Sequence, residues 1–401
     1  MKIKNLKFIY LILSVVFIFH LSSCSDNSNE PKAPEIRIVS QAKIGTKTRI
    51  ELGGLAYLAG VDVIPRYDVD LYKIEYYSTA KNSAPIVSSG LICVPATNTT
   101  KRGIVSCQHI TLLRNYEIPS QNTLASTITT LEAAIFASLG YVSVSNDYLG
   151  FGSTAKLNIP QSYHIYSYST TDWLAFMSAI TEFIAQNSIA TSNELRIIGY
   201  SQGGYNATAT MKKWETENHK FFNLREVYSG AGAYSLTKLV DVIFSHNDYA
   251  APYLMPPFVT AYNYYYDLNM SYENIYKPIY RNLIDDLYDV NSMLPVETIT
   301  YAIPKKLDDF LEEKFINEMK SKNSTFYSKL QENNLTNFAP RNKLYMFHSN
   351  GDEYIPVSIA DESYNYFASV GGNVELIKSQ KSASHSNTYI EFMNFVINKL
   401  K

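Results

Sequence analysis

The chain has 401 residues, 46% of them hydrophobic and 18% charged, which is enough apolar side chain to bury a sizeable core and excludes intrinsic disorder. Lys and Arg number 35 against 37 Asp and Glu, and no run of five or more like charges occurs. This balance excludes the basic surface of a nucleic-acid-binding protein, so no nucleic-acid partner is expected.

The N-terminus has the pattern of an export signal. Three lysines precede an apolar run from Phe8 to Phe19 that is too short to span a bilayer, and the run leads into Leu21-Ser22-Ser23-Cys24. This ending resembles the lipobox of bacterial lipoproteins, in which the cysteine is acylated. We therefore expect a signal peptide over residues 1–23, a membrane anchor on Cys24 and a flexible tether over residues 24–45, on the outer membrane or cell surface. The alternative is an ordinary signal peptide with a chance cysteine.

Two cysteines, Cys93 and Cys107, remain after Cys24, and both lie in apolar runs. We expect them to be buried, unpaired thiols that behave as small hydrophobic side chains. No Cys and His residues have zinc-binding spacing, so no metal is expected.

Strand patterns recur along the chain, and helical patterns fall between most of the later ones. Helices are expected over residues 127–138 and 171–187, the second with apolar residues at helical spacing from Trp173 to Ile184. This alternation predicts an α/β fold with a mostly parallel sheet covered on both faces, led by an antiparallel hairpin. The expected strands are 67–78, 86–94, 103–108, 141–146, 194–200, 224–229, 342–348 and 373–378.

The alternation stops between Tyr234 and Pro340, where Tyr- and Asn-rich segments intervene. We expect residues 236–338 to form a mainly helical cap inserted between two parts of the core, residues 46–235 and 339–401. Within the insertion, apolar residues from Leu307 to Met319 form one stripe, which predicts a single helix packed most simply on the rim of the sheet domain.

The sharpest signal is Gly199-Tyr200-Ser201-Gln202-Gly203-Gly204, between the expected strand 194–200 and a helical pattern over 205–214. A G-x-S-x-G sequence between a strand and a helix lifts a serine hydroxyl above the edge of a sheet, where it can act as a nucleophile. A serine needs an imidazole to take its proton and an acid to orient the imidazole, in the order Ser, Asp or Glu, His for this arrangement.

Elimination among seven histidines leaves His385, in a loop after the last expected strand and before the C-terminal helix. The acid is assigned to Asp352, because the strand 342–348 runs into a glycine turn just before it. Glu353 and Asp361 are the alternative acids. Ser201, Asp352 and His385 are therefore the candidate catalytic residues.

A second block, Gly140-Tyr141-Val142-Ser143-Val144-Ser145-Asn146-Asp147-Tyr148-Leu149-Gly150-Phe151-Gly152, precedes the serine motif. Together the two blocks resemble the secretory lipases and related bacterial esterases of the α/β-hydrolase fold. The resemblance implies an oxyanion hole made by the backbone N–H of Gln202 and a second N–H after the third strand. Relatives often have Gln-His-Gly there, whereas this chain has Gln108-His109-Ile110-Thr111, which leaves Thr111 as the second donor by position.

Two further residues near these blocks are expected to be structural. Asp147 should brace loops through hydrogen bonds, and His164 should also be structural, with a place in the pocket lining as its alternative role.

The expected function is hydrolysis of a small-molecule carboxylic ester through an acyl-enzyme, with no metal or organic cofactor. Two alternatives stay open. One is a serine peptidase of the same fold, for which Asp285, Asp286 and Asp289 in the insertion could hold a peptide terminus. The other is a non-catalytic lipoprotein that binds a ligand at the cell surface. The sequence does not indicate an oligomeric state.

Overall fold

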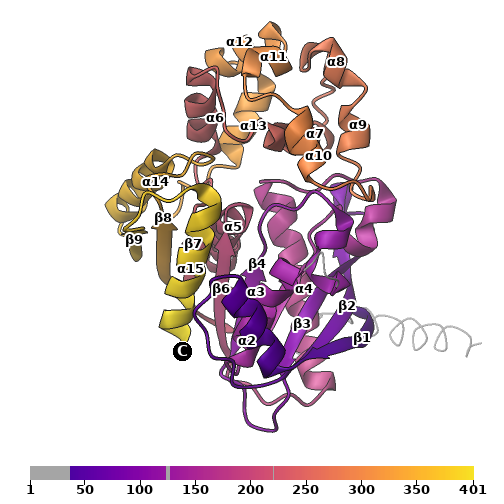
Figure 1. The fold of residues 1–401 in the computed structure, drawn as a ribbon, viewed down its shortest axis with the longest axis vertical. Helices are drawn as coiled ribbons and strands as arrows, with labels where there is room; N and C mark the ends of the chain where they lie inside the picture. The colour runs from indigo at the N-terminus through magenta and orange to yellow at the C-terminus, as the bar shows by residue number, and fades with distance from the viewer. Residues whose placement is uncertain (1–36, 123–126, 220) are drawn as a thin grey trace, which may run out of the picture. The chain divides into compact units, whose positions relative to one another are not determined.

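The computed structural model describes residues 37–122, 127–219 and 221–401, so the predicted signal peptide and Cys24 lie outside the described residues. Within them, nine strands form one sheet in the order β1-β2-β3-β5-β4-β6-β7-β8-β9 (Figure 1). The strands are β1 (Ile38–Lys47), β2 (Val69–Thr79), β3 (Pro85–Pro95), β4 (Ile104–Gln108), β5 (Val142–Asn146), β6 (Glu194–Tyr200), β7 (Asn223–Gly230), β8 (Lys343–His348) and β9 (Val374–Lys378).

Strands β4 to β9 run parallel to one another, whereas β1, β2 and β3 pair antiparallel with their neighbours, β3 with both β2 and β5. The predicted mostly parallel sheet with a leading antiparallel hairpin is therefore confirmed, and each of the eight expected strands is present. The parallel strands place their carboxyl ends at one edge of the sheet, which is where loops of α/β proteins carry functional residues.

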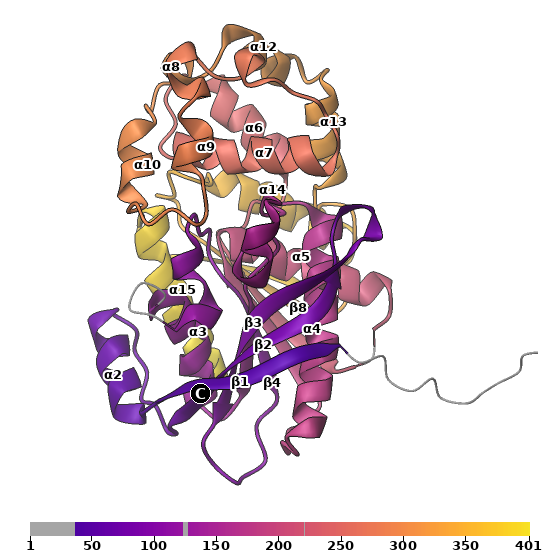
Figure 2. The ribbon, with the colours of Figure 1, turned by 90° about the vertical axis from the view of Figure 1, so that its right-hand side faces the viewer.

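Helices cover both faces of the sheet because its strands bury apolar side chains on both sides. In β6, Ile198 belongs to the apolar cluster under α2, α3 and α15, while Ile197 belongs to the cluster under α4, α5 and α14 (Figures 1 and 2). These helices are α2 (Arg49–Leu58), α3 (Thr127–Ser138), α4 (Tyr166–Gln186), α5 (Gln202–Thr216), α14 (Val357–Ser369) and α15 (His385–Leu400).

Strand β1 corrects the predicted tether, which is wrong for residues 38–45. These residues pair with β2 along its length, from Ile38 opposite Tyr76 to Lys47 opposite Val69. Most of the side chains of β1 are exposed, because it is an edge strand. An edge strand with few buried side chains gives no clear apolar alternation, so backbone pairing forms this strand without a sequence signal.

The insertion between β7 and β8 holds a separate group of helices that lies above the sheet in Figures 1 and 2, and we call residues 236–338 the cap. The cap buries an apolar cluster rich in tyrosine and phenylalanine, and this cluster continues into the sheet domain at residues such as Tyr205 and Ile359. Its helices are α6 (Leu236–Ser245), α7 (Met255–Tyr265), α8 (Pro278–Arg281), α9 (Ile284–Leu287), α10 (Glu297–Ala302), α11 (Leu307–Phe310), α12 (Glu313–Ser321) and α13 (Thr325–Glu332). Short 3₁₀ helices complete the chain at η1 (Lys81–Ser83), η2 (Asn115–Glu117), η3 (Pro119–Gln121), η4 (Gly152–Leu157), η5 (Pro252–Leu254) and η6 (Tyr272–Asn274).

The single helix predicted from Leu307 to Met319 is wrong, because the chain is extended at Leu311 and Glu312 between α11 and α12. There the Glu312 N–H donates to the Ile275 carbonyl, and its carboxylate pairs with Arg281 at 2.7 Å. These bonds to residues distant in sequence take the place of the backbone hydrogen bonds that a continuous helix would form here. The apolar stripe is still buried, but it packs inside the cap, where Phe315 contacts Phe244 and Phe326, and not chiefly on the rim of the sheet domain.

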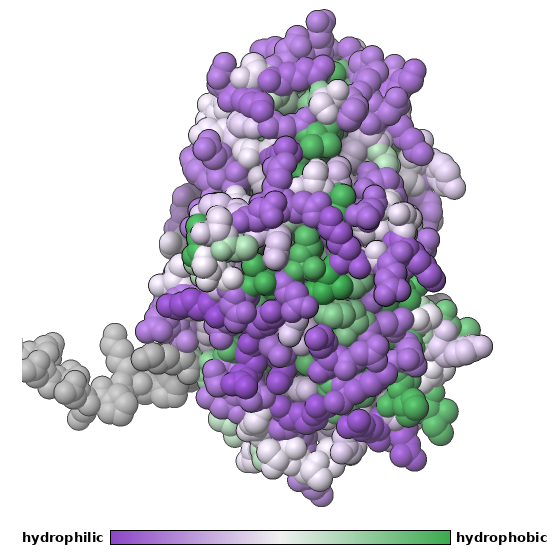
Figure 3. Space-filling model, turned by 90° about the vertical axis from the view of Figure 1, so that its left-hand side faces the viewer, coloured by the Kyte–Doolittle hydropathy of each residue, from purple (hydrophilic) through white to green (hydrophobic). Residues whose placement is uncertain are grey.

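Apolar side chains gather on one face of the protein, along the band where the cap meets the sheet domain and at the lower right of Figure 3, where α2 lies. The exposed large hydrophobic residues on and after α2 are Ile50, Tyr57, Leu58 and Ile64. Among the described residues, no helix has the length and apolar character needed to span a membrane.

Candidate active site

Ser201 lies in the sharp turn between β6 and α5. Its backbone has φ 58° and ψ −118°, a region that costs a non-glycine residue about 1–3 kcal/mol, and its N–H donates to the Gly230 carbonyl at 2.8 Å. The turn needs glycine on both sides. A Cβ on Gly199 would lie 2.1 Å from the Gly203 carbonyl oxygen, and a Cβ on Gly203 would lie 1.9 Å from that of Gln108.

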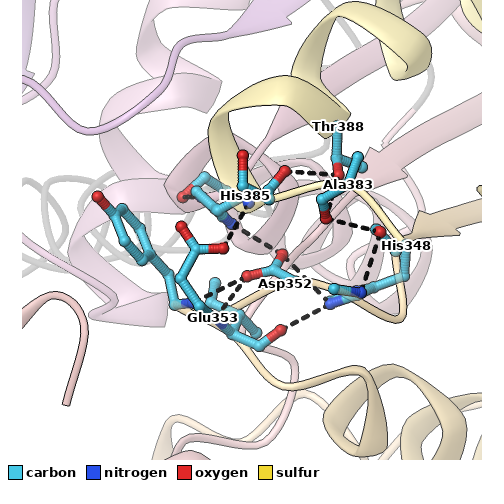
Figure 4. Close-up of polar contacts among 12 residues, drawn as sticks. His348, Asp352, Glu353, Ala383, His385 and Thr388 are labelled. Carbon is cyan, nitrogen blue, oxygen red and sulfur yellow. Dashed lines mark hydrogen bonds and ion pairs between the residues drawn. The ribbon is translucent and has the colours of Figure 1, made fainter. Parts of the chain in front are cut away.

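Three side chains from distant parts of the chain meet at this turn. The Ser201 Oγ lies 2.9 Å from Nε2 of His385, and Nδ1 of His385 lies 2.8 Å from Oδ2 of Asp352. His385 is the first residue of α15, and Asp352 lies in the loop after β8 (Figure 4). Both side chains are nearly inaccessible to solvent, so the bonds between them are little weakened by water.

The Asp352 carboxylate is held in a fixed orientation. Its Oδ1 accepts the backbone N–H groups of Tyr354 and Ile355 at 3.0 and 2.8 Å, which leaves Oδ2 facing His385. His348 approaches Oδ2 at 3.4 Å and bonds the Ile355 carbonyl at 2.7 Å. Burial lowers the pKa of His348, so this imidazole is neutral and does not compete as a cation for the carboxylate.

The alternative acids have other roles in this structure. The Glu353 carboxylate accepts the backbone N–H of His385 at 2.9 Å and so holds the start of α15, rather than the imidazole (Figure 4). Asp361, on α14, pairs with Lys378 at 2.7 Å on the surface.

Two tyrosines that the sequence does not single out also position His385. The Tyr200 hydroxyl donates to the His385 carbonyl at 2.6 Å, and the Tyr354 ring stacks on the imidazole with 4.9 Å between ring centres. Each lies within two residues of a candidate catalytic residue in sequence, but their contacts depend on how α15 packs across the loops.

The two predicted oxyanion donors, Gln202 and Thr111, come from separate segments, one directly after Ser201 and the other after β4. Gln202 begins α5, and its buried side chain accepts a hydrogen bond from Gln161 at 3.3 Å. Thr111 follows β4, lines the same cavity as Ser201 and bonds the Tyr163 hydroxyl at 3.0 Å. Within the described part of the chain, the backbone N–H groups of Gln202 and Thr111 donate to no protein acceptor. Both N–H groups are therefore available to a ligand.

Two cavities adjoin the Ser201 hydroxyl. The larger, of about 340 Å³, opens to solvent beside α15, and its lining includes Thr111, Leu113, Glu117, His385 and Tyr389. The smaller, of about 70 Å³, extends under the cap helices α6 and α7. Burial raises the pKa of Glu117, which accepts backbone N–H bonds at the edge of the larger cavity. Such concave, mostly apolar spaces with a few polar groups are typical of sites for small molecules.

The structural roles predicted for Asp147 and the two cysteines are confirmed. The Asp147 carboxylate accepts the hydroxyls of Ser89 and Ser120, both at 2.6 Å, and so ties β3 and η3 to the loop after β5. Cys93 and Cys107 are buried and unpaired, and burial raises the pKa of both thiols. Among the described residues, no three His, Cys, Asp or Glu side chains are grouped so that they could hold a metal ion.

Comparison with known proteins identifies the family. The sequence model for secretory lipases matches residues 117–394, which include Ser201, Asp352 and His385. The chain belongs to the secretory lipase family. This confirms the resemblance seen in the two sequence blocks, and it makes the chain a hydrolase of the lipase and esterase class. A search of curated proteins gives no match.

Solved structures share the fold of this secretory lipase. A Legionella pneumophila protein provisionally classed as a hydrolase is 22% identical with a TM-score of 0.82, covering 91% of this chain and 97% of that chain. The ligand-bound rice cell wall degrading esterase LipA of Xanthomonas oryzae is 19% identical, with a TM-score of 0.81 and coverage of 92% and 100%. Candida antarctica lipase A in its closed state is 13% identical, with a TM-score of 0.65 and coverage of 87% and 77%. These likenesses establish the α/β-hydrolase fold.

Proposed function

We propose that the protein hydrolyses small carboxylic esters through a covalent acyl-enzyme on Ser201. The observation that carries the proposal is the continuous hydrogen-bonded series from Ser201 Oγ through His385 to Asp352, with 2.9 and 2.8 Å between its heavy atoms, at the edge of two cavities. A serine hydroxyl, an imidazole and a carboxylate in this order are the set that acyl transfer requires.

The reaction proceeds in two halves. The Ser201 oxygen attacks the ester carbonyl carbon while His385 Nε2 takes the hydroxyl proton, and Asp352 stabilises the imidazolium that forms. The bond to the alcohol oxygen then breaks, and His385 gives its proton to that oxygen as the alcohol leaves. A water molecule next loses a proton to His385 and attacks the acyl carbon, which releases the carboxylic acid and restores the serine.

The negative charge on the carbonyl oxygen needs donors placed in advance. We assign this role to the backbone N–H groups of Gln202 and Thr111, which are free to receive it. The N-terminus of α5 adds a positive helix end beside the same oxygen. Removal of one such donor costs an acyl-transfer enzyme about 3–4 kcal/mol of transition-state stabilisation.

An activity assay tests the proposal. Purified protein is expected to hydrolyse 4-nitrophenyl acetate and 4-nitrophenyl butanoate, and Ser201→Ala is expected to lower kcat/KM by at least about 10³-fold while the circular dichroism spectrum is unchanged. A folded Ser201→Ala variant that keeps most of the wild-type rate would contradict the mechanism. A wild-type protein that hydrolyses neither ester would favour a non-catalytic surface lipoprotein.

The peptidase alternative has weaker support around the cavities. Asp285 accepts a hydrogen bond from Tyr272, and Asp289 accepts the Asn291 N–H, so both bond within the cap, and none of the three cap acids lines either cavity beside Ser201. A comparison of ester and aminoacyl-amide hydrolysis by one preparation separates the two activities.

The membrane anchor remains a separate proposal, supported by the signal-like N-terminus and the Leu-Ser-Ser-Cys sequence ending at Cys24. The secretory lipase family is consistent with export of the chain. Full-length protein is expected in the membrane fraction of expressing bacteria, and Cys24→Ala is expected to move it to the soluble fraction. Equal membrane association of both forms would contradict acylation at Cys24.

A further inference from the structure

The two cavities at Ser201 differ in which catalytic groups they contact. Ser201, Leu254 and Tyr354 line both, so these residues form the boundary where the cavities meet. His385 lines the larger cavity and is not part of the smaller one. An ester bound at Ser201 extends in two directions from its carbonyl carbon, and the two cavities provide one space for each.

The position of His385 assigns the two halves of the ester. The alcohol oxygen receives its proton from His385 Nε2 when it leaves, so the alcohol must lie on the side that this imidazole contacts. The alcohol therefore occupies the larger cavity, and the acyl chain extends into the smaller cavity under α6 and α7. This assignment rests on the proposed function, because it uses the proposed role of His385.

The volume of the smaller cavity limits the acyl chain. An apolar protein cavity of about 150 Å³ accommodates benzene, with its six carbon atoms. By that proportion, the roughly 70 Å³ under the cap accommodates about three carbon atoms beyond the ester carbonyl. Apolar side chains of α6 and α7, among them Val240, Ile243 and Phe258, surround this space, so a charged acyl group would lose its hydration there without a counter-charge.

His164 lines the smaller cavity, and its side chain forms no hydrogen bond with the described residues. It is 5% exposed, and neither ring nitrogen bonds any of the described residues. The other polar lining groups are engaged, because the Tyr163 hydroxyl bonds Thr111 and the Tyr249 hydroxyl donates to the Tyr354 carbonyl. The aromatic rings of Tyr205 and Phe258 pack around the imidazole and keep it in place.

The imidazole of His164 is neutral, because burial lowers its pKa to about 3. A neutral imidazole has one nitrogen that donates and one that accepts a hydrogen bond. A hydroxyl can both donate and accept, so it pairs with either nitrogen, whereas a carbonyl pairs only with the N–H. A buried polar group without a partner is costly, and a ligand hydroxyl at this position would remove that cost.

We propose that the smaller cavity binds a short hydroxylated acyl group, whose hydroxyl is hydrogen-bonded by His164. His164 is then a specificity-determining residue for the ester hydrolase, and the preferred substrates are esters of short hydroxy acids. Simple alkanoyl esters of the same length are poorer substrates because they leave the imidazole unpaired.

Matched ethyl esters test the proposal, with kcat/KM followed by titration of the released acid. The pairs are 3-hydroxybutanoate against butanoate and 2-hydroxypropanoate against propanoate, with octanoate as the long-chain comparison. In the wild-type protein we expect the hydroxyl to raise kcat/KM by about tenfold or more in at least one pair, and octanoate to react at least tenfold more slowly than butanoate. A ratio of one or less in both pairs would overturn the hydroxyl assignment, and equal rates for octanoate would overturn the size limit.

Three variants identify His164 as the source of the preference. His164→Phe should bring the ratio between the matched esters to about one. His164→Asn, which tolerates the observed φ of 53° and keeps a donor and an acceptor, should retain part of the preference. Tyr249→Phe removes a hydroxyl from the same cavity that is already bonded to protein, so it should leave the ratio unchanged. A preference that persists undiminished in folded His164→Phe would overturn the inference.

The outcomes separate this inference from the proposed function. If wild-type protein hydrolyses both members of each pair equally and Ser201→Ala hydrolyses neither, the role of His164 fails and the serine mechanism stands. If the wild-type protein hydrolyses none of the esters, the proposed function fails and the inference fails with it.

Discussion

The proposed role of Asp352 makes Asp352→Asn the most informative single substitution after the nucleophile itself. In the structure, Oδ1 accepts the N–H groups of Tyr354 and Ile355 and Oδ2 faces Nδ1 of His385. An asparagine can keep the first oxygen in place, so the loop should retain its conformation. Its NH₂ group, however, would then face His385 Nδ1 where the carboxylate oxygen was.

This exchange reverses the polarity of one hydrogen bond. Because the amide NH₂ donates, His385 Nδ1 must accept, and the ring proton moves to Nε2, which faces the Ser201 hydroxyl 2.9 Å away. Nε2 can then no longer take the serine proton, and the negative charge that balances the imidazolium is lost. In a serine protease the same exchange lowers kcat by about 10⁴-fold, which corresponds to about 5 kcal/mol.

The assay compares kcat/KM for 4-nitrophenyl butanoate between the wild type, Asp352→Asn and Asp361→Asn, with thermal unfolding as the check on folding. We expect a loss of at least about 10³-fold for Asp352→Asn and less than about threefold for Asp361→Asn, whose carboxylate pairs with Lys378 at the surface. A folded Asp352→Asn variant that loses less than tenfold, or a larger loss in Asp361→Asn, would refute the assignment of the acid.

Two further predictions concern stability. Gly203→Ala should lower the free energy of unfolding by about 3 kcal/mol or prevent folding, because the new Cβ would lie 1.9 Å from the Gln108 carbonyl oxygen. The control is Gly54→Ala in α2, where a Cβ meets no atom within 4 Å, so this variant should be neutral or slightly stabilising in urea unfolding. Equal unfolding midpoints for the two variants would contradict the close packing of the turn. Burial raises the pKa of Glu132 to about 8, so between about pH 4.5 and 8 the folded protein holds a proton that the unfolded chain has lost. Ionisation of this carboxyl should therefore lower the free energy of unfolding as the pH rises from 5 to 8, by at most about 4 kcal/mol. Glu132→Gln should remove that part of the dependence of the free energy of unfolding on pH. An unchanged pH dependence in this variant would show that Glu132 is not buried in its neutral form.

The elements of the core could be predicted because each carries a local signal. The strands from β2 to β8 bury side chains on one or both faces, and β9 packs the partly buried Val374 and Leu376 against the same core. The turn at Ser201 depends on glycines that stand close to it in sequence. His385 and Asp352 could be assigned from chain order and loop context. The two side chains meet because their loops follow the parallel strands β8 and β9, which end at the same edge of the sheet.

Other features depend on contacts that have no local signal. Strand β1 is exposed along most of its length and forms by pairing with β2. The break between α11 and α12 depends on Arg281 and on Ile275, more than thirty residues away. The unpartnered imidazole of His164 and the smaller cavity arise only when cap helices close over the sheet domain, so the sequence could offer no more than a structural role or a place in the pocket lining for this residue.

Covalent labelling tests the central claim most directly. Folded protein is treated with a fluorophosphonate, residual hydrolysis of 4-nitrophenyl butanoate is measured, and the modified peptide is identified by mass spectrometry. We predict one phosphonyl group per chain, located on Ser201, with activity falling in proportion to labelling. Active protein that is labelled at another residue, or that keeps its activity with Ser201 fully modified, would contradict the account.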